Sequence, residues 1–387
     1  MNKENKNYQP KILYSTNIAG LGGGETSLVN LLSSLQNHNF NPILVCPPGK
    51  LENRASRLGI TTISLEFPPI RLYAGFIPLF SPLTIFKIIL LIKKYKIDIV
   101  HVESLLSLFY CGSAALIANV PCVATYHGFW LLNQRPNRAL LKLCQRLYPV
   151  SKTTAIDLDG IVPDFKIRLI PLGINLHFFD KLPSKTECRI TYGLPLNKPI
   201  IMQIGRFQPI KGQMILLEAL AEIIRSKKCS IPLVVYVGGI LDTQTDEAVL
   251  YKQTVEKRAL KDDLRGNVRF LGWQEDIPKL MQAADIVITP SDYETFSLVT
   301  VEAMAVGKLV IATSCGGPSE IIQDQLTGIL IPPQNPIALA EAICIALSDP
   351  SRTEEIASNA KVFATHNFSP LIRYNSILNE YKELLSS

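Results

Sequence analysis

Two carboxylates, Glu294 and Glu302, stand eight residues apart where an apolar run meets a helical pattern. The run at 285–290, DIVITP, has the length and β-branched content of a buried parallel strand, and residues 296–306 have a helical pattern that Gly307 ends. Ligands of open parallel sheets bind where such strand-to-helix loops leave the carboxyl ends of the strands. We therefore expect both carboxylates and the amino end of this helix to face a polar, partly anionic ligand.

A pair of cations stands at the end of another apolar strand, in the segment IGRFQPIKG at 204–212. It places Arg206 and Lys211 on a loop that leads into a helix. Two fixed cations can stabilise the negative charge that grows on a departing diphosphate. Such a pair alone is more often a solvated cap on a surface loop, but its combination with the two carboxylates in the same half of the chain favours a catalytic role.

The first half of the chain offers a glycine-rich loop and a histidine. The loop GLGGGE at 20–25 follows the first predicted strand, and Gly23 and Gly24 would let the backbone approach a ligand closely. The loop is not GxGxxG and the chain has no Walker motif, which argues against a dinucleotide or ATP site. His127 follows a strand predicted at 121–125, and a structural and a functional role stay equally open for it.

Taken together, these segments resemble the retaining nucleotide-sugar glycosyltransferases of the GT-B fold, in particular glycosyltransferase family 4 (glycosyl transferases group 1). The family pattern is a Glu, seven residues, and a second Glu followed by Ala, which Glu294 and the pair at 302–303 match. The segment GGPSE at 316–320 is similar to the family's Gly-Gly-x-x-Glu, and the loop at 20–25 to its Gly-Gly-x-Glu. The resemblance covers nearly the whole chain.

The resemblance implies a role for each candidate residue. Arg206 and Lys211 would contact the donor diphosphate, Glu302 the donor ribose, and Glu294 and His127 the transferred sugar. It also implies that the reaction needs no metal and no cofactor. The further donor-binding residues that we expect are Gly23, Gly24, Phe296, Ser297 and Leu298.

Strands and helices alternate along both halves of the chain, which predicts an α/β fold. With the resemblance, we expect a GT-B protein of two Rossmann-like domains whose parallel sheets face a cleft. A run rich in Pro and Gly at 171–199 separates the halves. We assign 1–175 to an amino-terminal acceptor domain, 176–367 to a nucleotide-sugar donor domain, and 368–387 to a helix that returns to the first domain.

The composition of the chain limits which binding partners and which cellular compartment we expect. The formal net charge of +6 comes without a dense Lys/Arg block, so nucleic acid is not an expected partner. The eight cysteines are scattered without a CxxC pair, which predicts reduced thiols, a cytoplasmic location and no metal site. The first ten residues have no apolar core of a signal peptide.

Two stretches leave peripheral membrane contact open as a second interpretation. The apolar stretch at 76–92 is interrupted by Pro78, Pro82 and Lys87, and we expect a core helix at 82–94 instead of a transmembrane span. In the stretch at 135–146, four basic residues are spaced as one helix face: Arg135, Arg138, Lys142 and Arg146. We expect this face to be solvated, with an anionic membrane as the alternative.

The predicted function is the transfer of a sugar, with retention, from a UDP- or GDP-sugar to a hydroxyl of a glycan or lipid-linked acceptor. We expect a place for this reaction in the synthesis of polysaccharides or glycoconjugates. Two other functions stay open: a sugar-nucleotide epimerase on the same fold, and a binding subunit without turnover. An epimerase would convert the donor in the absence of any acceptor.

Overall fold

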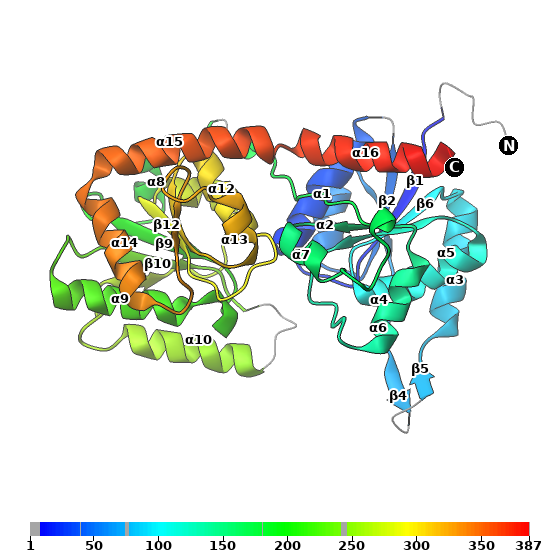
Figure 1. Ribbon diagram of the computed structural model, residues 1–387, viewed down its shortest axis with the longest axis horizontal. Helices are drawn as coiled ribbons and strands as arrows, with labels where there is room; N and C mark the ends of the chain where they lie inside the picture. The colour runs from blue at the N-terminus through cyan, green and yellow to red at the C-terminus, as the bar shows by residue number, and fades with distance from the viewer. Residues whose placement is uncertain (1–7, 39, 74–76, 180, 241–245, 387) are drawn as a thin grey trace. The chain divides into compact units, whose positions relative to one another are not determined.

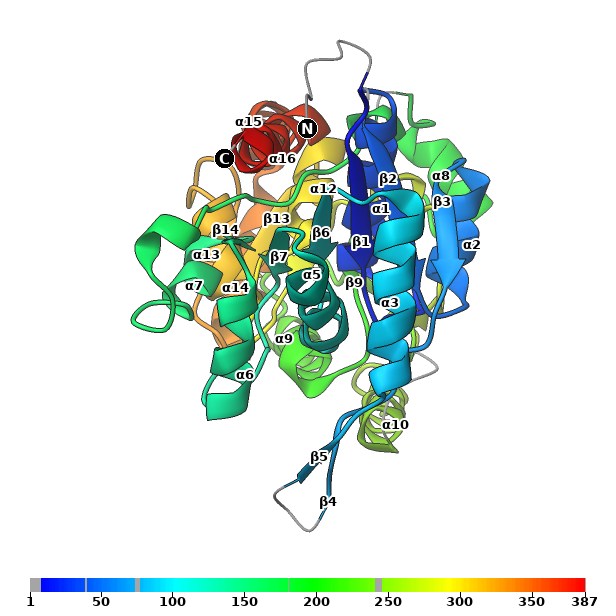
Figure 2. The same cartoon turned by 90° about the vertical axis from the view of Figure 1, so that its right-hand side faces the viewer.

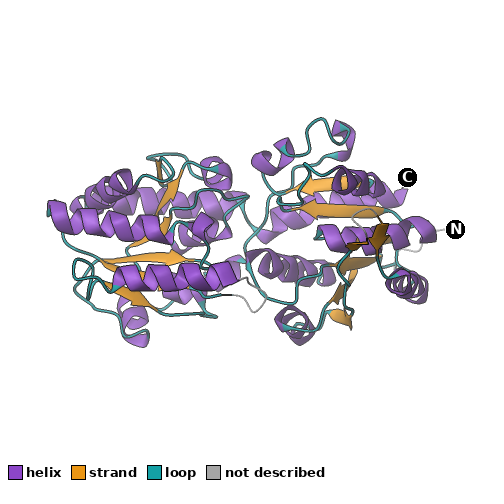
Figure 3. Ribbon diagram, turned by 90° about the horizontal axis from the view of Figure 1, so that it is seen from below, coloured by secondary structure: helices purple, strands orange, loops and turns teal. Residues whose placement is uncertain are grey.

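The computed structural model describes residues 8–38, 40–73, 77–179, 181–240 and 246–386. The chain divides into two compact units. Met1–Gly173 and Pro370–Ser387 make up unit 1, and Ile174–Ser369 makes up unit 2. In each unit, helices cover both faces of a sheet (Figures 1 and 3).

The sheet of unit 1 has six parallel strands in the order β3-β2-β1-β6-β7-β8. Their bounds are β1 Lys11–Ser15, β2 Asn41–Cys46, β3 Thr61–Ser64, β6 Ile99–Val102, β7 Cys122–Tyr126 and β8 Arg146–Pro149. A separate antiparallel pair is formed by β4 Arg71–Tyr73 and β5 Ile77–Leu79. The stretch that joins these two short strands lies outside the described residues.

The helices of unit 1 lie on both faces of its sheet. They are α1 Gly23–Gln36, α2 Lys50–Arg57, α3 Pro82–Tyr95, α4 Leu105–Ser107, α5 Ser113–Ala118, α6 Arg135–Leu140, α7 Lys152–Ile156 and α16 Pro370–Ser386. A π-helical turn, η1 Leu108–Gly112, precedes α5, and the short 3₁₀ turns are η2 Leu141–Leu143 and η3 Asp164–Lys166. The helix expected at 82–94 is therefore present as α3, with its N-cap at Ser81 and Pro82 in its first turn.

The sheet of unit 2 is also parallel, in the order β11-β10-β9-β12-β13-β14. Its strands are β9 Ile200–Ile204, β10 Leu233–Val237, β11 Val268–Phe270, β12 Ile286–Thr289, β13 Leu309–Thr313 and β14 Ile329–Ile331. Its helices are α8 Lys185–Thr191, α9 Gln213–Ser226, α10 Asp246–Ala259, α11 Ile277–Gln282, α12 Leu298–Val306, α13 Gly316–Ile321, α14 Pro336–Ser348 and α15 Pro350–Asn367. The 3₁₀ turns are η4 Leu176–Phe178 and η5 Pro209–Lys211.

Both sheets have the doubly wound order, in which the chain builds outward from a central strand first to one side and then to the other. In unit 1 the order reverses between β1 and β6, and in unit 2 between β9 and β12. At such a reversal the two loops at the carboxyl ends diverge and leave room for a ligand. The predicted α/β class with two Rossmann-like parallel sheets is confirmed.

The carboxyl-terminal helix α16 belongs to unit 1, where it packs on α1. Its buried residues Tyr374, Ile377 and Tyr381 join the core on the α1 face of the sheet. Arg373 is also buried and donates a hydrogen bond to the Ser27 hydroxyl. The opposite face of the sheet is covered by a second core, to which α3 and α5 contribute.

The main error of the sequence-based predictions concerns residues 135–146. The sixth strand of the sheet is β8, where the basic helix was expected to continue. Helix α6 ends at Leu140, so Arg146 is not part of a basic helix face. Arg146 begins β8 and pairs instead with Glu380 and Glu383 of α16. Leu147 and Tyr148 favour a strand over a helix here, because their side chains are buried in the cores on opposite faces of the sheet.

A second correction concerns the cysteines. Cys229 and Cys344 form a disulfide across 115 residues of sequence, with their Cα atoms 5.3 Å apart. The expectation that all thiols are reduced is therefore wrong for this pair. The spacing of the cysteines in the sequence could not predict this contact, because it forms only when α14 packs on α9.

Candidate functional site

Lys211 and Glu294 meet at the switch point of the unit 2 sheet. Lys211 lies at the end of the loop after β9, and Glu294 on the loop after β12. The Lys211 ammonium donates a hydrogen bond to Glu294 Oε1 at 2.7 Å, and the Ser291 hydroxyl donates to the same oxygen at 2.9 Å. Two predicted site residues from separate loops are thus joined in one half-buried ion pair.

Two glycines hold these loops against each other. Gly212 has a φ of +67°, and a Cβ there would lie 2.0 Å from the Pro290 carbonyl oxygen. A Cβ on Gly317 would lie 2.2 Å from the Phe296 carbonyl oxygen. Neither distance can be tolerated, so only glycine fits. The Gly317 N–H also donates to the Glu294 carbonyl at 2.8 Å, which fixes the backbone that carries the carboxylate.

Arg206 is placed on the same loop as Lys211 but is free to bind an anion. Its carbonyl accepts a hydrogen bond from Gln213 Nε2 at 2.8 Å, which anchors the backbone. The side chain is exposed, and the guanidinium has no hydrogen-bond or ion-pair partner among the described residues. Five N–H donors are therefore available at the carboxyl end of β9.

Glu302 lies on α12 and is half-buried without a partner. Its carboxylate makes no hydrogen bond or ion pair within the described part of the chain. Burial raises the pKa of Glu302 to about 7. A lone carboxyl group in this position is costly to ionise and gains from any ligand that donates hydrogen bonds to it.

The amino end of α12 starts two residues later than expected. Ser297 is its N-cap, buried, with a left-handed φ of 77°, and Leu298 is its first helical residue. Within the described residues, the N–H groups of Ser297 and Leu298 donate to no acceptor. They remain available to an anion, as expected. Phe296 is buried edge-on against Phe368 at 5.7 Å, so its ring belongs to the core.

In unit 1 the predicted residue His127 is joined by a residue that the sequence analysis missed. His127 Nε2 lies 2.7 Å from Oε2 of the buried Glu103, which directly follows β6 at the switch point of that sheet. The Thr125 hydroxyl donates to Glu103 Oε1 at 3.0 Å. Burial by itself would raise the pKa of Glu103, but the hydrogen bond from His127 and the nearby positive groups lower it to about 2.

The Glu103 carboxylate fixes the tautomer of a neutral His127. Nε2–H donates to the carboxylate, so Nδ1 is the nitrogen left to accept a proton or a hydrogen bond. The glycine-rich loop lies beside this ring, because a Cβ on Gly24 would come 3.9 Å from His127 Cε1. Gly23 is the first residue of α1. The structure thus brings Gly23, Gly24 and His127 to one edge of the unit 1 sheet.

A buried chain of hydrogen bonds leads from this histidine site to the carboxyl-terminal helix. His101 Nε2 lies 2.7 Å from the Thr125 hydroxyl, and its Nδ1 contacts the Tyr381 hydroxyl of α16. Burial lowers the pKa of His101 to about 4, so the ring is neutral at neutral pH.

Glu103 could have been predicted as a site residue from the sequence, since it is the first carboxylate after a buried strand.

The loop after β7 has an unusual backbone. Gly128, Phe129 and Leu131 all have positive φ, of 83°, 60° and 49°. Both Phe129 and Leu131 are exposed, although large side chains seldom adopt this conformation. Such strain costs of order 1–3 kcal/mol per residue and is concentrated at functional sites.

Comparison with known proteins decides the family. The model of glycosyl transferases group 1 matches residues 184–363, and that of glycosyltransferase family 4 matches residues 21–178. The chain belongs to glycosyltransferase family 4. Unit 2 carries the match to the group 1 model and unit 1 the match to the other, so this family 4 protein is matched over most of its length.

Individual relatives agree with this assignment. An uncharacterised glycosyltransferase of Methanocaldococcus jannaschii is 29% identical over 286 residues, which cover 69% of this chain and 70% of the relative. A UDP-Gal:α-D-GlcNAc-diphosphoundecaprenol α-1,3-galactosyltransferase of Escherichia coli is 25% identical, over 76% of this chain and 78% of its own. Anabaena HepE, solved with UDP-glucose, is 25% identical with a TM-score of 0.83, over 96% of this chain and 99% of its own. This family 4 protein is a glycosyltransferase of the GT-B fold.

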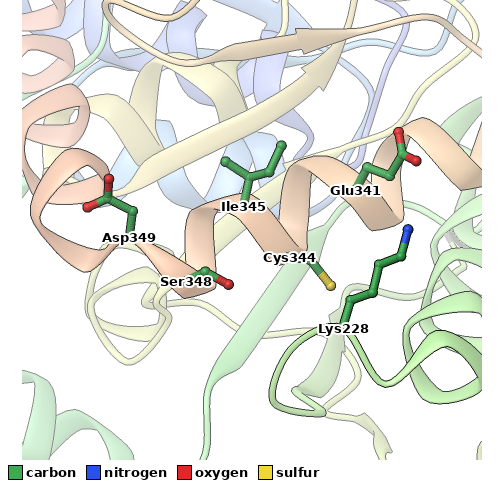
Figure 4. Close-up of a pocket in the computed structure, with 6 residues that line it drawn as sticks. All are labelled: Lys228, Glu341, Cys344, Ile345, Ser348 and Asp349. Atoms are coloured by element: carbon green, nitrogen blue, oxygen red, sulfur yellow. The ribbon is translucent and has the colours of Figure 1, made fainter.

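A hollow of about 500 Å³ elsewhere in this glycosyltransferase contains none of the candidate residues (Figure 4). It is lined by Lys228, Glu341, Cys344, Ile345, Ser348 and Asp349. Both α9 and α14 follow a parallel strand, so their carboxyl-terminal ends reach the amino edge of the sheet. The hollow therefore lies opposite the edge that carries Lys211 and Glu294.

Within the described residues, no group of three or more His, Cys, Asp or Glu side chains could hold a metal ion. In the same part of the chain, no helix has the length and apolar content needed to span a bilayer.

Proposed function

We propose that this glycosyltransferase transfers a sugar from a UDP-sugar to a hydroxyl of a glycan or lipid-linked acceptor, with retention and without a metal. The observation that carries the proposal is the Lys211–Glu294 ion pair at the switch point of unit 2, on whose β9 loop Arg206 has no partner among the described residues. This arrangement offers fixed positive charge for a diphosphate and a carboxylate for sugar hydroxyls. A UDP-sugar donor is supported by the UDP-galactose donor of the Escherichia coli relative and by the UDP-glucose bound in the Anabaena structure.

The donor residues divide the work as follows. Arg206 and Lys211 bind the two phosphates, and the free N–H groups of Ser297 and Leu298 donate to phosphate oxygens. Glu302 accepts hydrogen bonds from the ribose hydroxyls, which compensates for the cost of ionising a half-buried carboxyl group. Glu294 and His127 act on the hydroxyls of the transferred sugar.

The transfer proceeds on one face of the sugar. The bond between the sugar C1 and the diphosphate oxygen breaks, and the acceptor hydroxyl oxygen bonds to C1 from the same side. The acceptor proton passes to the departing diphosphate, whose new charge Arg206 and Lys211 stabilise. The configuration at C1 is thereby retained, and no protein nucleophile is required.

The acceptor is assigned to unit 1, where the strained loop at 128–131 exposes Phe129 and Leu131. We also assign the segment at 72–80 of the same unit to the acceptor, and part of it lies outside the described residues. We place the enzyme in the cytoplasm. Six of its cysteines are free and buried, which fits a reducing compartment, although the Cys229–Cys344 pair does not.

The test is a transfer assay with EDTA present. The purified chain is incubated with UDP-glucose, UDP-galactose or UDP-GlcNAc, with and without prenyl-diphosphate-linked GlcNAc or alkyl glycosides as acceptors. Formation of a product with the donor's anomeric configuration, seen by NMR, would support the proposal. An altered UDP-sugar without any acceptor would indicate an epimerase, and UDP-sugar binding without any product would indicate a binding subunit.

A further inference from the structure

The positive charge of the chain is concentrated in one segment of unit 1. Residues 67–156 contain ten of the 39 Lys and Arg residues but only two of the 33 Asp and Glu residues. The segment therefore has a formal charge of +8, which exceeds the +6 of the whole chain. Of these two acids, Glu103 is buried, and Asp98 is half-buried just before β6, where it accepts hydrogen bonds from Tyr8 and the Lys11 N–H.

Three helices of this segment, α3, α5 and α6, form one layer on the same face of the unit 1 sheet. Helix α3 packs on α5. A Cβ on Gly112, next to α5, would lie 3.2 Å from the side chain of Leu143, in the turn that follows α6. All three elements contribute to one core cluster, and their outer sides face the viewer in Figure 2.

The outer side of this layer is apolar at its centre. On α3, Leu83, Phe86 and Leu90 follow one another at helical spacing and are 61%, 55% and 49% exposed. At the end of α5, Leu116 and Ile117 are 67% and 65% exposed. The inner face of α3 packs against the rest of unit 1, since Ile88 and Ile92 are buried in the core. A helix that is apolar on both faces is unusual at a protein–water boundary.

The same three helices and the residues next to them also carry cations that have no ion-pair partner among the described residues. Those on or next to the three helices are Lys87, Lys93, Lys94, Lys96, Arg135, Arg138 and Lys142. Among the described residues, none of the seven makes a salt bridge to an acid. On α3, Lys87 directly follows Phe86, and Lys93 and Lys94 lie one helical turn after Leu90.

We propose that the outer face of α3, α5 and α6 docks on an anionic lipid bilayer. The apolar side chains would enter the boundary between headgroups and acyl chains, and the lysines would extend their charged ends to the phosphates. Each Lys or Arg near an anionic surface adds roughly 1 kcal/mol of attraction. A second copy of the chain fits less well, because it would bring the same positive charge against this face. The inference rests on the proposed function in one respect, that a lipid-linked acceptor is met at such a surface.

Vesicle flotation of the full chain tests this inference, with vesicles of neutral phosphatidylcholine alone and with vesicles that also contain anionic phosphatidylglycerol. The wild type should float with the anionic vesicles and stay behind with the neutral ones. Lys87→Glu with Lys94→Glu should weaken binding about 30-fold or more, the fold-change that corresponds to the loss of two such attractions. Phe86→Ser with Leu90→Ser should weaken it similarly, and raised salt should weaken the wild type.

Matched controls in unit 2 are Leu250→Ser and Lys257→Glu, both on α10, which should float like the wild type. All variants should keep the circular dichroism and the UDP affinity of the wild type, so a failure to float is separable from misfolding and from an error in the proposed donor. In addition, the fluorescence of a Phe86→Trp variant should shift to the blue only with anionic vesicles. Equal flotation with neutral vesicles, flotation that the α3 variants leave unchanged, or a dimer that Phe86→Ser dissociates would each overturn the proposal.

Discussion

Glu103 Oε2 lies 2.7 Å from His127 Nε2, at the carboxyl ends of neighbouring strands of the unit 1 sheet. The carboxylate is buried and ionised at neutral pH, because its pKa is lowered to about 2. It therefore orients the histidine ring and stabilises any positive charge that the ring acquires during the reaction. We assign Glu103 as a positioning residue that acts through His127.

The Glu103→Gln variant tests this assignment. It keeps the size of the side chain but removes the charge that orients the ring, so kcat should fall on the order of 10²-fold while KM changes little. Glu103→Asp keeps the charge and should recover part of the activity. Glu52→Gln, at a half-buried position on α2 of the same unit, should retain the activity of the wild type. A rise in KM alone, with kcat unchanged, would exclude this role.

Arg206→Ala should lower kcat on the order of 10²-fold or more, the scale for one electrostatic stabiliser of a transition state. Among the described residues the guanidinium has no partner, so the substitution should cost little stability. The measurement is steady-state transfer or UDP-sugar hydrolysis. Arg225→Ala, on an exposed ion pair of α9, is the matched control and should retain full activity. An unchanged rate in the Arg206 variant would remove this residue from the mechanism.

The ion pair between Lys211 and Glu294 should appear as energetic coupling in a double-mutant cycle. Lys211→Ala and Glu294→Ala each break the 2.7 Å contact, so the double variant should lose less than the sum of the two single losses. For half-buried partners in contact, the coupling energy should be about 0.5–3 kcal/mol in urea unfolding. Additive losses would mean that the two side chains do not interact in solution.

Much of the donor half of this site could be predicted from the sequence, because its parts are local. Arg206, Lys211, Glu294 and Glu302 each stand within a few residues of a strong strand pattern, and parallel strands bring their carboxyl ends together. The helices α3 and α12 also lie within two residues of their predicted bounds. These positions could be predicted because turns and periodic apolar patterns depend on residues close in sequence and not on tertiary contacts.

The parts that escaped prediction depend on contacts between distant segments. The short edge strands β3 and β14 have no distinctive pattern of their own. Glu103 becomes a partner of His127 only because β6 and β7 pair in this register. Arg146 was placed on a helix because four cations happened to share a helical spacing, whereas its neighbours form a buried strand. The contact of Tyr381 with His101 joins residues 280 positions apart.

Tyr381→Phe should destabilise unit 1 by about 1–3 kcal/mol, since it leaves buried polar groups of Tyr14 and His101 without a partner. Urea unfolding at pH 7 measures this loss. Tyr374→Phe is the matched control, because the Tyr374 hydroxyl on the same helix makes no hydrogen bond to any described residue. Equal stability of the two variants would indicate that the chain of hydrogen bonds contributes nothing.

Glu302→Gln should make the ligand-free protein more stable at pH 8 than the wild type. The pKa of Glu302 is raised from 4.5 to about 7 by burial, so its contribution to stability is full below pH 4.5 and is lost as the pH rises through 7. At pH 8 the neutral amide avoids this loss, which should amount to about 1–3 kcal/mol. At pH 4.5 the two proteins should unfold at the same urea concentration, and a difference there would contradict the assignment to ionisation.

The same carboxyl group should make UDP binding depend on pH. The ionised form accepts hydrogen bonds from the ribose, so affinity should be full above pH 7 and should fall as the pH drops below it. Calorimetry at pH 6 and pH 8 measures the ratio of the two affinities. Because UDP itself titrates in this range, the ratio is compared with that of Glu302→Gln, which should be smaller. Equal ratios would place Glu302 outside the ribose contact.

The central claim is that unit 2 binds a nucleoside diphosphate without a metal, through Arg206 and Glu302. The most direct measurement is thermal unfolding of the full chain with UDP, GDP, ADP or CMP in the presence of EDTA. At 100 times its Kd, the correct ligand should add roughly 2.7 kcal/mol of stability. We predict stabilisation by UDP in the wild type and in Arg225→Ala, and its loss in Arg206→Ala and Glu302→Ala. No stabilisation by any diphosphate, or stabilisation that survives in both site variants, would contradict the account.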